Sequence, residues 1–370
     1  MSTVRVLMIV DHIGTNGTIT HILSIVRSLR TKGVPALIAG KIGSMHDRIN
    51  EERIPYYEID FPDLFTNEIQ KYPGIIESLE RIIQKEKITL IHGHQAYSSY
   101  LVSKFAQSYN IPYIYTVHGL YNTNDELMKI IRQSDEVIAV SPYVYNYLNE
   151  LSSKKPIFIP NGIDLNEFKL VSSIELREQL KIPMEAITIF YASRLEWKKA
   201  KICMMLLKSV MMLKRNVNMN IHIIIAGEGK REKQIKDMAV IINKKQPENI
   251  IHFVGQQTYL NEYFSLADCI IGTGRTALEG LACDKQVIAV GNKGYLGLVT
   301  EDNWEQARYS HFGDHSAPNP LTQPILMEDI KSQAEYHDSN KKTKSLRSLV
   351  LKDFNIEQTV NSLIKLYKKY

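Results

Sequence analysis

Short apolar segments alternate with amphipathic stretches along most of the chain, and this alternation predicts strands separated by helices. Residues 4–10 form a continuous apolar run, which is typical of a strand buried on both faces of a parallel sheet. The next stretch carries apolar residues at helical spacing, and residues 34–39 form a second apolar run. This opening predicts a βαβ unit. The same order recurs in the second half, with strands expected at 187–192 and 221–226.

The alternation covers enough of the chain to predict an α/β protein with two Rossmann-like domains. The chain has 370 residues, which is enough for two domains of ordinary size. Between its halves stands PNGID, residues 160–164, whose Pro, Asn and Gly favour a tight turn. We expect an N-terminal domain over residues 1–163, a C-terminal domain over 164–352 and a last helix within 353–370.

Three segments depart from the simple pattern. Residues 68–87 predict a helix that starts or bends at Pro73. Residues 291–304, GNKGYLGLVTEDNW, form a Gly-rich connection to which the pattern assigns no role, and residues 311–324 are expected to be a loop.

One segment, DCIIGTGRTALEGLA at residues 268–282, has the order strand, Gly-rich turn and helix. A helix that begins after such a turn presents unpaired N–H groups and a positive dipole end, which suits a phosphate. The candidate residues of the turn are Thr273, Gly274, Arg275 and Thr276. Glu279, one turn into the helix, could accept two hydroxyl hydrogen bonds from a ribose. The alternative is an ordinary strand–turn–helix with a solvated glutamate.

A second segment, ITIFYASRLEWKK at residues 187–199, is an apolar strand followed by Arg194 and, five residues later, Lys199. Open α/β sheets bind ligands at the carboxyl ends of their strands. A guanidinium and an ammonium together neutralise a diphosphate, at about 1.5–3 kcal/mol for each charge-assisted hydrogen bond. The alternative is a solvated helix start, although cations are disfavoured at that end of a helix.

These segments resemble the retaining GT-B glycosyltransferases of family 4. SRLEWKKA is similar to the family signature Arg-Leu-x-x-x-Lys-Gly, with Arg194 and Lys199 at its cation positions. TGRTALEGLACDKQVIA resembles the segment that ends in Glu-Ala-x-Ala-x-Gly-x-Pro-Val-Ile, and PNGID resembles the linker between the domains. GTNGTITHILSIVRSLRTKG resembles the first Gly-rich loop and helix. The matches span nearly the whole chain in the family's order.

The resemblance implies two Rossmann-like domains that face each other across a cleft, with a C-terminal helix that crosses back to the N-terminal domain. It implies transfer of a sugar, with retention, from a nucleotide diphosphate sugar to an acceptor hydroxyl in polysaccharide, glycolipid or glycoconjugate synthesis. UDP is the nucleotide that family frequency favours. Arg194, Lys199 and the helix start after Gly274 would stabilise the leaving diphosphate. The chain has no Asp-x-Asp triplet, so we expect no metal and no cofactor.

The resemblance also assigns roles to further residues. His118, in the segment Val-His-Gly, would lie beside the donor sugar. The loop with Gly14 and Gly17 would approach the donor diphosphate. The turns after two later strands would face the ribose and the base, through Gly227 and Glu228 and through Gly255 and Gln256.

The chain departs from the family pattern at one important position. Ile271 stands where many members have a glutamate next to the sugar, eight residues before Glu279. This leaves open how the sugar hydroxyls are held, and the backbone N–H groups of Thr273, Gly274 and Arg275 are one answer. It also keeps two alternatives: a catalytically silent nucleotide-sugar-binding protein, which would bind a donor without turnover, and a nucleotide-sugar epimerase.

Composition and charge narrow the remaining possibilities. The net charge of +5 comes from scattered residues without a recognition motif, so we expect no nucleic-acid partner. The three cysteines are separated and lie in apolar segments, which indicates buried thiols in a reducing compartment. No apolar run approaches the roughly 20 residues of a spanning helix. We expect a cytoplasmic protein whose acceptor is a sugar, a lipid-linked sugar or a small molecule.

Two minor features leave alternatives. The helix at 68–87 carries Arg81, Lys85 and Lys87, which suit a peripheral contact with a membrane, but glutamates interleave them, as on a solvated face. His92 and His94 have the spacing of one strand face and could be metal ligands. No third ligand is evident, so histidines in or near the cleft are the preferred interpretation.

Overall fold

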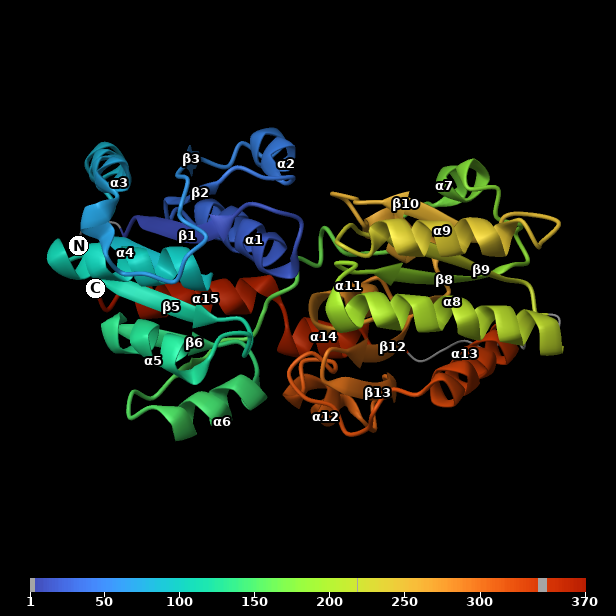
Figure 1. Ribbon diagram of the computed structural model, residues 1–370. Coiled ribbons are helices and arrows are strands. Elements are labelled where there is room, and N and C mark those ends of the chain that lie inside the picture. Colours follow the sequence, from blue (N-terminus) through green and yellow to red (C-terminus); the bar gives the residue numbers. More distant parts are fainter. Residues whose placement is uncertain (1–3, 218, 339–344) are drawn as a thin grey trace. The chain divides into compact units, whose positions relative to one another are not determined.

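The computed structural model describes residues 4–217, 219–338 and 345–370. The chain divides into two compact units, each built around its own sheet (Figure 1). The first unit combines the residues up to Asp164 with Phe354–Tyr370, and the second contains Leu165–Asp353. Each sheet is mainly parallel and alternates with helices along the chain. The prediction of an α/β fold with two Rossmann-like domains is confirmed.

The first unit has a parallel sheet of seven strands within the described residues, in the order β3-β2-β1-β4-β5-β6-β7. Its central strands are buried throughout, as the apolar runs predicted. The strands are β1 (Val6–His12), β2 (Ala36–Lys41), β3 (Tyr56–Glu58), β4 (Leu90–Gly93), β5 (Tyr113–Val117), β6 (Glu136–Ala139) and β7 (Ile157–Phe158).

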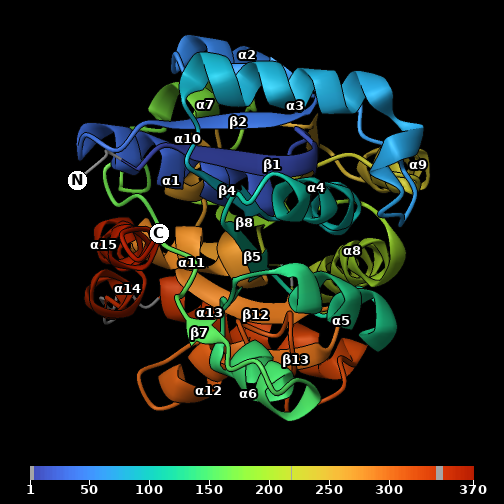
Figure 2. The same cartoon turned by 90° about the vertical axis from the view of Figure 1, so that its left-hand side faces the viewer.

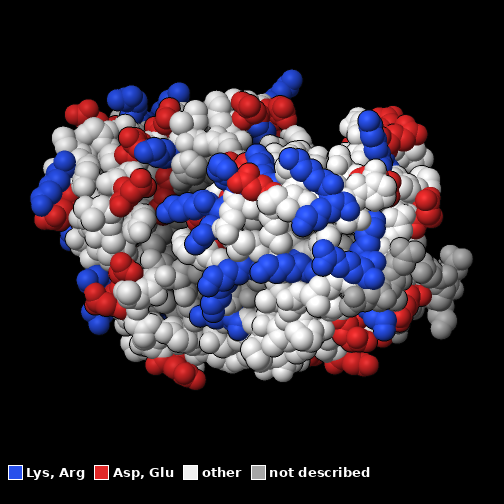
Figure 3. Space-filling model, turned by 45° about the vertical axis from the view of Figure 1, so that its right-hand side comes forward, with Lys and Arg blue, Asp and Glu red and all other residues white. Residues whose placement is uncertain are grey.

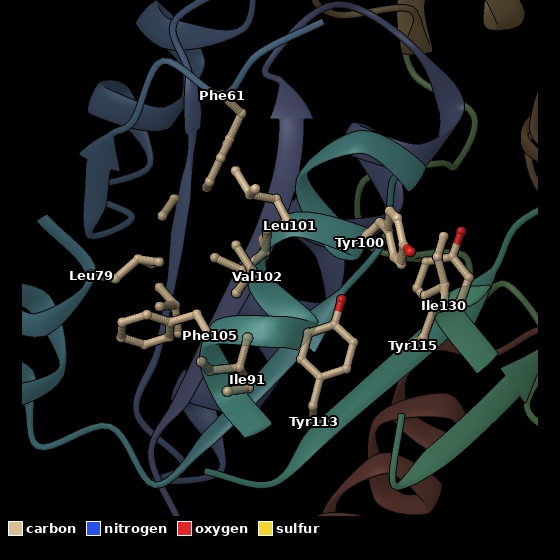
Figure 4. Close-up of a cluster of buried hydrophobic side chains, with 14 of the residues drawn as sticks. Phe61, Leu79, Ile91, Tyr100, Leu101, Val102, Phe105, Tyr113, Tyr115 and Ile130 are labelled. Carbon is tan, nitrogen blue, oxygen red and sulfur yellow. The ribbon is translucent and has the colours of Figure 1, made fainter. Parts of the chain in front are cut away.

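Helices cover both faces of this sheet. They are α1 (Gly17–Thr31), α2 (His46–Glu51), α3 (Pro73–Glu86), α4 (Ala96–Ser108), α5 (Asn124–Gln133), α6 (Pro142–Leu151) and α15 (Ile356–Tyr367), with a short 3-10 helix at Ile69–Lys71. One core lies between the sheet and the side that carries α3, α4 and α5. Figure 4 shows part of it, where Leu79, Phe105 and Tyr113 contribute large apolar surfaces.

The second core of the first unit depends on the end of the chain. α15 packs against α1 (Figure 2). Its residues Ile356, Val360 and Leu363 are buried in the cluster that also contains the apolar face of α1. The last helix is therefore part of the first unit, although the whole second unit precedes it in the sequence.

The second unit has a six-stranded sheet in the described residues, in the order β10-β9-β8-β11-β12-β13. All neighbouring strands are parallel except β12 and β13. The strands are β8 (Ile187–Ala192), β9 (Ile221–Ala226), β10 (Ile251–Gly255), β11 (Cys269–Gly272), β12 (Gln286–Gly291) and β13 (Gly294–Leu298). The helices are α7 (Ile174–Gln179), α8 (Trp197–Val217), α9 (Glu232–Asn243), α10 (Asn261–Leu266), α11 (Gly274–Ala282), α12 (Trp304–Tyr309), α13 (Gln323–Asp338) and α14 (Arg347–Asp353).

The elements differ from expectation in two places. The Gly-rich connection at 291–304 contains β13, which adds an antiparallel edge to the sheet, and the first residue of α12. The helix expected around residue 73 starts there, as α3, and the preceding residues form a separate 3-10 turn. Pro73 can begin a helix because its missing N–H would have no partner in the first turn.

Surface charge and cysteine burial complete the description. The three free cysteines are buried, as predicted. None of the helices in the described residues is long and apolar enough to cross a membrane. Figure 3, in which the right-hand side of Figure 1 comes forward, shows Lys and Arg side chains gathered on one face.

Candidate functional site

Two neighbouring strands of the second unit bring the candidate phosphate-binding segments to one edge of the sheet. β8 and β11 pair in parallel, with Ile189 opposite Cys269, so their carboxyl ends lie side by side. Lys199 follows β8 on α8, and the Gly-rich turn follows β11. The two segments touch directly, because Thr276 Oγ1 donates a 3.4 Å hydrogen bond to the carbonyl of Ala192.

The cations that follow β8 have different environments. Lys199 is half-buried, and its Nζ lies 3.9 Å from Asp314 Oδ1. Its carbonyl accepts a 2.7 Å hydrogen bond from the Tyr191 hydroxyl, which fixes the first turn of α8. Arg194 is exposed, with its guanidinium carbon 5.8 Å from the centre of the Trp197 ring. Lys199 is therefore held in place by the fold, whereas Arg194 lies on the surface.

The start of α11 is closed by a second segment of the chain. Gly274 has φ of +53°, which a glycine adopts without strain. Its N–H donates a 3.3 Å hydrogen bond to the carbonyl of His311, and Thr273 Oγ1 donates a 2.7 Å bond to the carbonyl of Phe312. The Gly274 N–H, which the sequence offered as a donor to the sugar or phosphate, is thus occupied in this conformation.

Glu279 and Arg275 form a buried ion pair within α11. The Nε and Nη2 atoms of Arg275 both lie 3.0 Å from Glu279 Oε1, and each side chain is only 6% exposed. The four-residue spacing places the two side chains on one face of the helix. The prediction treated Arg275 as a backbone donor and Glu279 as a ribose acceptor, and it missed this pair.

The two turns expected near the ribose and the base meet at the carboxyl ends of β9 and β10. The Gly227 N–H donates a 2.8 Å hydrogen bond to the carbonyl of Gly255. A Cβ atom on Gly227 would lie 1.9 Å from the Ser193 carbonyl oxygen, so only glycine fits this approach. Glu228 is exposed and Gln256 is half-buried.

Gly14 and Gly17 lie in the loop between β1 and α1 of the first unit. Gly14 is buried, and a Cβ atom there would lie 2.7 Å from His12 Nδ1. Gly17 is exposed and is the first residue of α1. Asn16 caps the helix by accepting a 3.1 Å hydrogen bond from the Ile19 N–H. The Asn16 side chain therefore takes up the N–H of Ile19 in the first turn of α1, at the positive end of the helix dipole.

His118, at the end of β5, is oriented by a buried histidine. Its Nε2 lies 3.1 Å from His94 Nδ1, and His94 Nε2 lies 3.3 Å from Met8 Sδ. A thioether sulfur can only accept, so the proton of His94 is on Nε2. Burial lowers the pKa of His94 well below its usual range, so the ring is neutral and its Nδ1 accepts. His118 must then donate from Nε2.

His92 is a structural residue of the first unit. Its ring nitrogens lie 2.6 Å from the Tyr367 hydroxyl and 2.7 Å from Thr116 Oγ1. Burial lowers its pKa to about 3, so the ring is neutral at physiological pH. A Cβ atom on Gly93, between the two histidines, would lie 1.9 Å from the Tyr113 hydroxyl, which explains the order His-Gly-His.

A different group of residues could hold a metal. Among the described residues, His311, Asp314 and His315 form the one group of at least three potential ligands whose ligand atoms all lie within 4.8 Å of one another. All three are buried, and the two imidazole rings stack with centroids 4.6 Å apart. The sequence pattern predicted only a loop in this segment, although two histidines and an aspartate within five residues were a usable signal of a ligand site.

The predicted site residues thus fall into two sets. Lys199, Thr273, Gly274, Arg275 and Thr276 gather around the start of α11, with Glu279 paired to Arg275. The two turns that contain Gly227 and Gly255 share the same sheet edge. His118, Gly14 and Gly17 belong to the first unit.

Solved structures with the same fold include glycosyltransferases and a UDP-GlcNAc 2-epimerase. The structure of HepE from Anabaena in complex with UDP and glucose has a TM-score of 0.74 at 16% identity and covers 99% of this chain and 100% of that one. Sucrose-phosphate synthase from Thermosynechococcus elongatus has a TM-score of 0.72 at 18% identity, covering 99% of this chain and 98% of that one. At these identities the likeness shows the fold, which is GT-B.

Sequence comparison shows the family. An uncharacterized glycosyltransferase of Methanocaldococcus jannaschii is 25% identical over 277 residues, 67% of this chain and 67% of that protein. One component of the phosphatidylinositol N-acetylglucosaminyltransferase of Arabidopsis thaliana is 25% identical over 241 residues, 61% of this chain and 50% of that protein. Residues 15–167 match the family model of Glycosyltransferase Family 4, and residues 172–309 match that of Glycosyl transferases group 1. The chain therefore belongs to the group 1 glycosyltransferases that carry a Family 4 N-terminal region.

Proposed function

We propose that the protein transfers a sugar from a nucleotide diphosphate sugar to an acceptor hydroxyl, with retention at the anomeric carbon. The observation that carries this proposal is the approach of Lys199 to the start of α11 at the carboxyl edge of β8 and β11. An ammonium group and a helix N-terminus at one sheet edge suit a diphosphate. UDP is the proposed nucleotide, and the UDP-bound structure of HepE, which shares the fold, supports it.

The chemistry that these residues would perform is electrostatic. The diphosphate gains negative charge as the glycosidic bond breaks, and Lys199, Arg194 and the positive end of α11 would stabilise that charge. Because Arg194 is exposed, its side chain would move to contact the ligand when the ligand binds, rather than already lie in the binding position. Because these cations can balance the leaving group, the proposal needs no metal and no cofactor in this role. The leaving phosphate would help to take the acceptor proton, so no dedicated protein base is required.

The remaining site residues would position the donor. Arg275 holds Glu279 Oε1, so a ribose contact of Glu279 would form beside this ion pair. The backbones of the turns with Gly227, Glu228, Gly255 and Gln256 would face the ribose and the base. The loop with Gly14 and Gly17 would approach the diphosphate from the first unit.

His118 would contact the donor sugar. The Nε2 atom of His118 faces His94, so its contact with a sugar hydroxyl would be made through Nδ1.

The acceptor is proposed from the relatives. The Arabidopsis relative is named for a phosphatidylinositol substrate, which supports a lipid-linked acceptor alongside a sugar or a small molecule. A cytoplasmic enzyme with peripheral membrane contact would fit such an acceptor. Helix α3 of the first unit offers Arg81 and Lys85 for that contact, and Lys87 follows its last residue. The acidic residues of α3 would weaken the contact.

The test is the release of nucleoside diphosphate from a panel of UDP-, GDP- and ADP-sugars, with and without a chelator. Wild type should hydrolyse one donor slowly, and Lys199→Ala should reduce that rate about 100-fold or more. Lys233→Ala is the matched control, since Lys233 lies on α9 of the same unit in an exposed pair with Asp237. Equal rates in Lys199→Ala and wild type would refute the assigned role.

A silent nucleotide-sugar-binding protein is the second candidate, and one observation favours it. The family glutamate is absent at Ile271, which is fully buried in β11, and Glu279 is engaged by Arg275. Donor binding by calorimetry without turnover, even with acceptors from a native lysate, would support this candidate. An absence of binding to every nucleotide sugar would remove both.

A further inference from the structure

The turn at residues 311–315, HFGDH, is fixed against the start of α11. The carbonyl of His311 accepts from the Gly274 N–H, and the carbonyl of Phe312 accepts from Thr273 Oγ1 at 2.7 Å. A Cβ atom on Gly274 would lie 3.1 Å from His311 Cε1 and 3.7 Å from Asp314 Oδ2. The side chains of this turn therefore lie directly beside the proposed diphosphate site.

An unusual backbone directs three polar side chains of this turn to one place. His311, Phe312 and Gly313 have φ of 50°, 54° and 85° in succession. The left-handed region is costly for residues with a side chain, by about 1–2 kcal/mol each. Phe312 is fully buried against Trp304, with ring centroids 5.8 Å apart, and this burial holds the turn. The turn then places polar atoms of His311, Asp314 and His315 within 4.8 Å of one another.

The distance between Asp314 and Lys199 indicates that the side chains of the 311–315 turn lie within reach of a ligand bound by Lys199. The distance of 3.9 Å between Asp314 Oδ1 and Lys199 Nζ is too long for a charge-assisted hydrogen bond between them, which spans about 2.7–2.9 Å. A ligand group held by Lys199 therefore lies within reach of Asp314. In a nucleotide sugar, the group bonded to the terminal phosphate is the sugar ring.

We propose that the 311–315 turn is the sugar-binding part of the donor site, with Asp314 as acceptor for sugar hydroxyls and His311 and His315 as its imidazole partners. This inference rests on the proposed function and names the residues that would hold the sugar. A carboxylate accepts hydrogen bonds from two neighbouring hydroxyls, and an imidazole can donate or accept. The turn thereby supplies a carboxylate that β11 lacks at Ile271, whose side chain is part of the apolar core.

A divalent cation is the competing occupant, since two imidazoles and a carboxylate suit zinc and related metals. The Lys199 ammonium disfavours it, because a cation bound by Asp314 would lie close to that positive charge. A neutral sugar hydroxyl meets no such repulsion from Lys199.

The experiment compares two ligands on one variant by calorimetry in the presence of a chelator. The ligands are the nucleotide sugar that wild type binds from the panel and the corresponding nucleoside diphosphate. Asp314→Asn should weaken the nucleotide sugar about tenfold and the nucleoside diphosphate less than twofold. Asp237→Asn, on the surface of α9, is the matched control and should change neither.

Deoxy donors identify the contact. A nucleotide sugar that lacks the hydroxyl bound by Asp314 should bind wild type about tenfold more weakly than the parent, and Asp314→Asn should not distinguish the two. His315→Gln provides a second variant, because a glutamine can donate or accept but cannot titrate. Retained affinity for the nucleoside diphosphate shows that each variant is folded.

Three outcomes would overturn the inference. Equal losses for both ligands would mean that Asp314 acts only through Lys199. An unchanged affinity for the nucleotide sugar would remove the contact. Loss of nucleotide-sugar binding by wild type on chelation, with recovery on addition of zinc or manganese, would assign the turn to a metal. Failure of wild type to bind any nucleotide sugar would instead refute the proposed function, so the two failures are distinguishable.

Discussion

Replacement of Glu279 by alanine should destabilise the second unit, because it removes the carboxylate partner of a buried guanidinium. Arg275 is only 6% exposed, and both of its nitrogens in the pair lie 3.0 Å from one oxygen of Glu279. Removal of one partner of a buried pair costs about 3–5 kcal/mol, since the other charge stays in a poorly solvated place. For a unit of this size, about 3 kcal/mol corresponds to a fall of about 6–12 °C in Tm.

The chain offers a specific optical probe for this measurement. It contains two tryptophans, Trp197 and Trp304, and both lie in the second unit. Trp304 is buried and donates a 2.7 Å hydrogen bond to Asp353, so its emission should shift to longer wavelength when that unit unfolds. Urea titrations followed by tryptophan emission therefore report the free energy of unfolding of the second unit.

A double-mutant cycle separates the pair from its surroundings. Arg275→Met combined with Glu279→Leu replaces both charges by apolar groups of similar volume and should recover most of the loss. A Glu279→Ala variant within about 0.5 kcal/mol of wild type would refute the reasoning. A double variant whose loss of stability equals the sum of the losses in the two single variants would also refute the reasoning. The result matters for activity as well, since turnover lost in Glu279→Ala would then include unfolded protein, whereas Glu279→Gln would be the better probe of chemistry.

Three further predictions concern the backbone and the buried histidines. Gly227→Ala should unfold the second unit or lower its Tm strongly, since the new Cβ atom would lie 1.9 Å from a carbonyl oxygen. Gly74→Ala is the control, because Gly74 has open space around it, and it should change the Tm by no more than about 2 °C. Equal effects of the two substitutions on the Tm would contradict this prediction. The pKa of His92 is lowered from 6.5 to about 3, so below pH 6.5 the unfolded chain binds more protons than the folded chain. Through this ring, the free energy of unfolding of the first unit should therefore fall by about 1.4 kcal/mol for each unit by which the pH is lowered below 6.5. Urea unfolding followed by circular dichroism at pH 7 and pH 5 measures this pH dependence of the free energy of unfolding. The same pH dependence in His92→Gln as in wild type would disprove the prediction. Nitrogen-15 spectra at pH 7.5 should show His94 protonated on Nε2, and Met8→Leu should raise its Nδ1-protonated fraction; a wild-type ring protonated on Nδ1 would refute the tautomer assignment.

The sequence predicted the buried strands well, because their apolar runs are continuous and long. β8 and β9 have the expected bounds, and both are buried along their whole length. β13 was missed because its five residues, GYLGL, include two glycines and show no regular alternation. Its strand conformation comes from pairing with β12, which is a tertiary contact that no local pattern encodes.

Part of the candidate site was predicted because it lies next to continuous apolar strands. Motif spacing located Lys199 and the start of α11, since both come shortly after apolar strands. The contact between Gly274 and His311 joins segments 37 positions apart in numbering and depends on a left-handed turn, so a single sequence does not reveal it. The spacing of Arg275 and Glu279 was visible, but an ion pair on one helix face is usually solvated, and only the structure shows that this one is buried.

The position of α15 has a consequence for the order in which the protein folds during synthesis. The ribosome completes the second unit before it makes the helix whose Ile356, Val360 and Leu363 close the first unit. At about 5–20 residues per second, the apolar face of α1 therefore stays uncovered for about 10–40 s after residue 164 is made. A nascent chain would expose this surface to chaperones for longer than any part of the second unit. Loss of the last 15 residues, for example through a premature stop codon, would leave the second unit intact, whereas the first unit would lack the helix that covers the apolar face of α1.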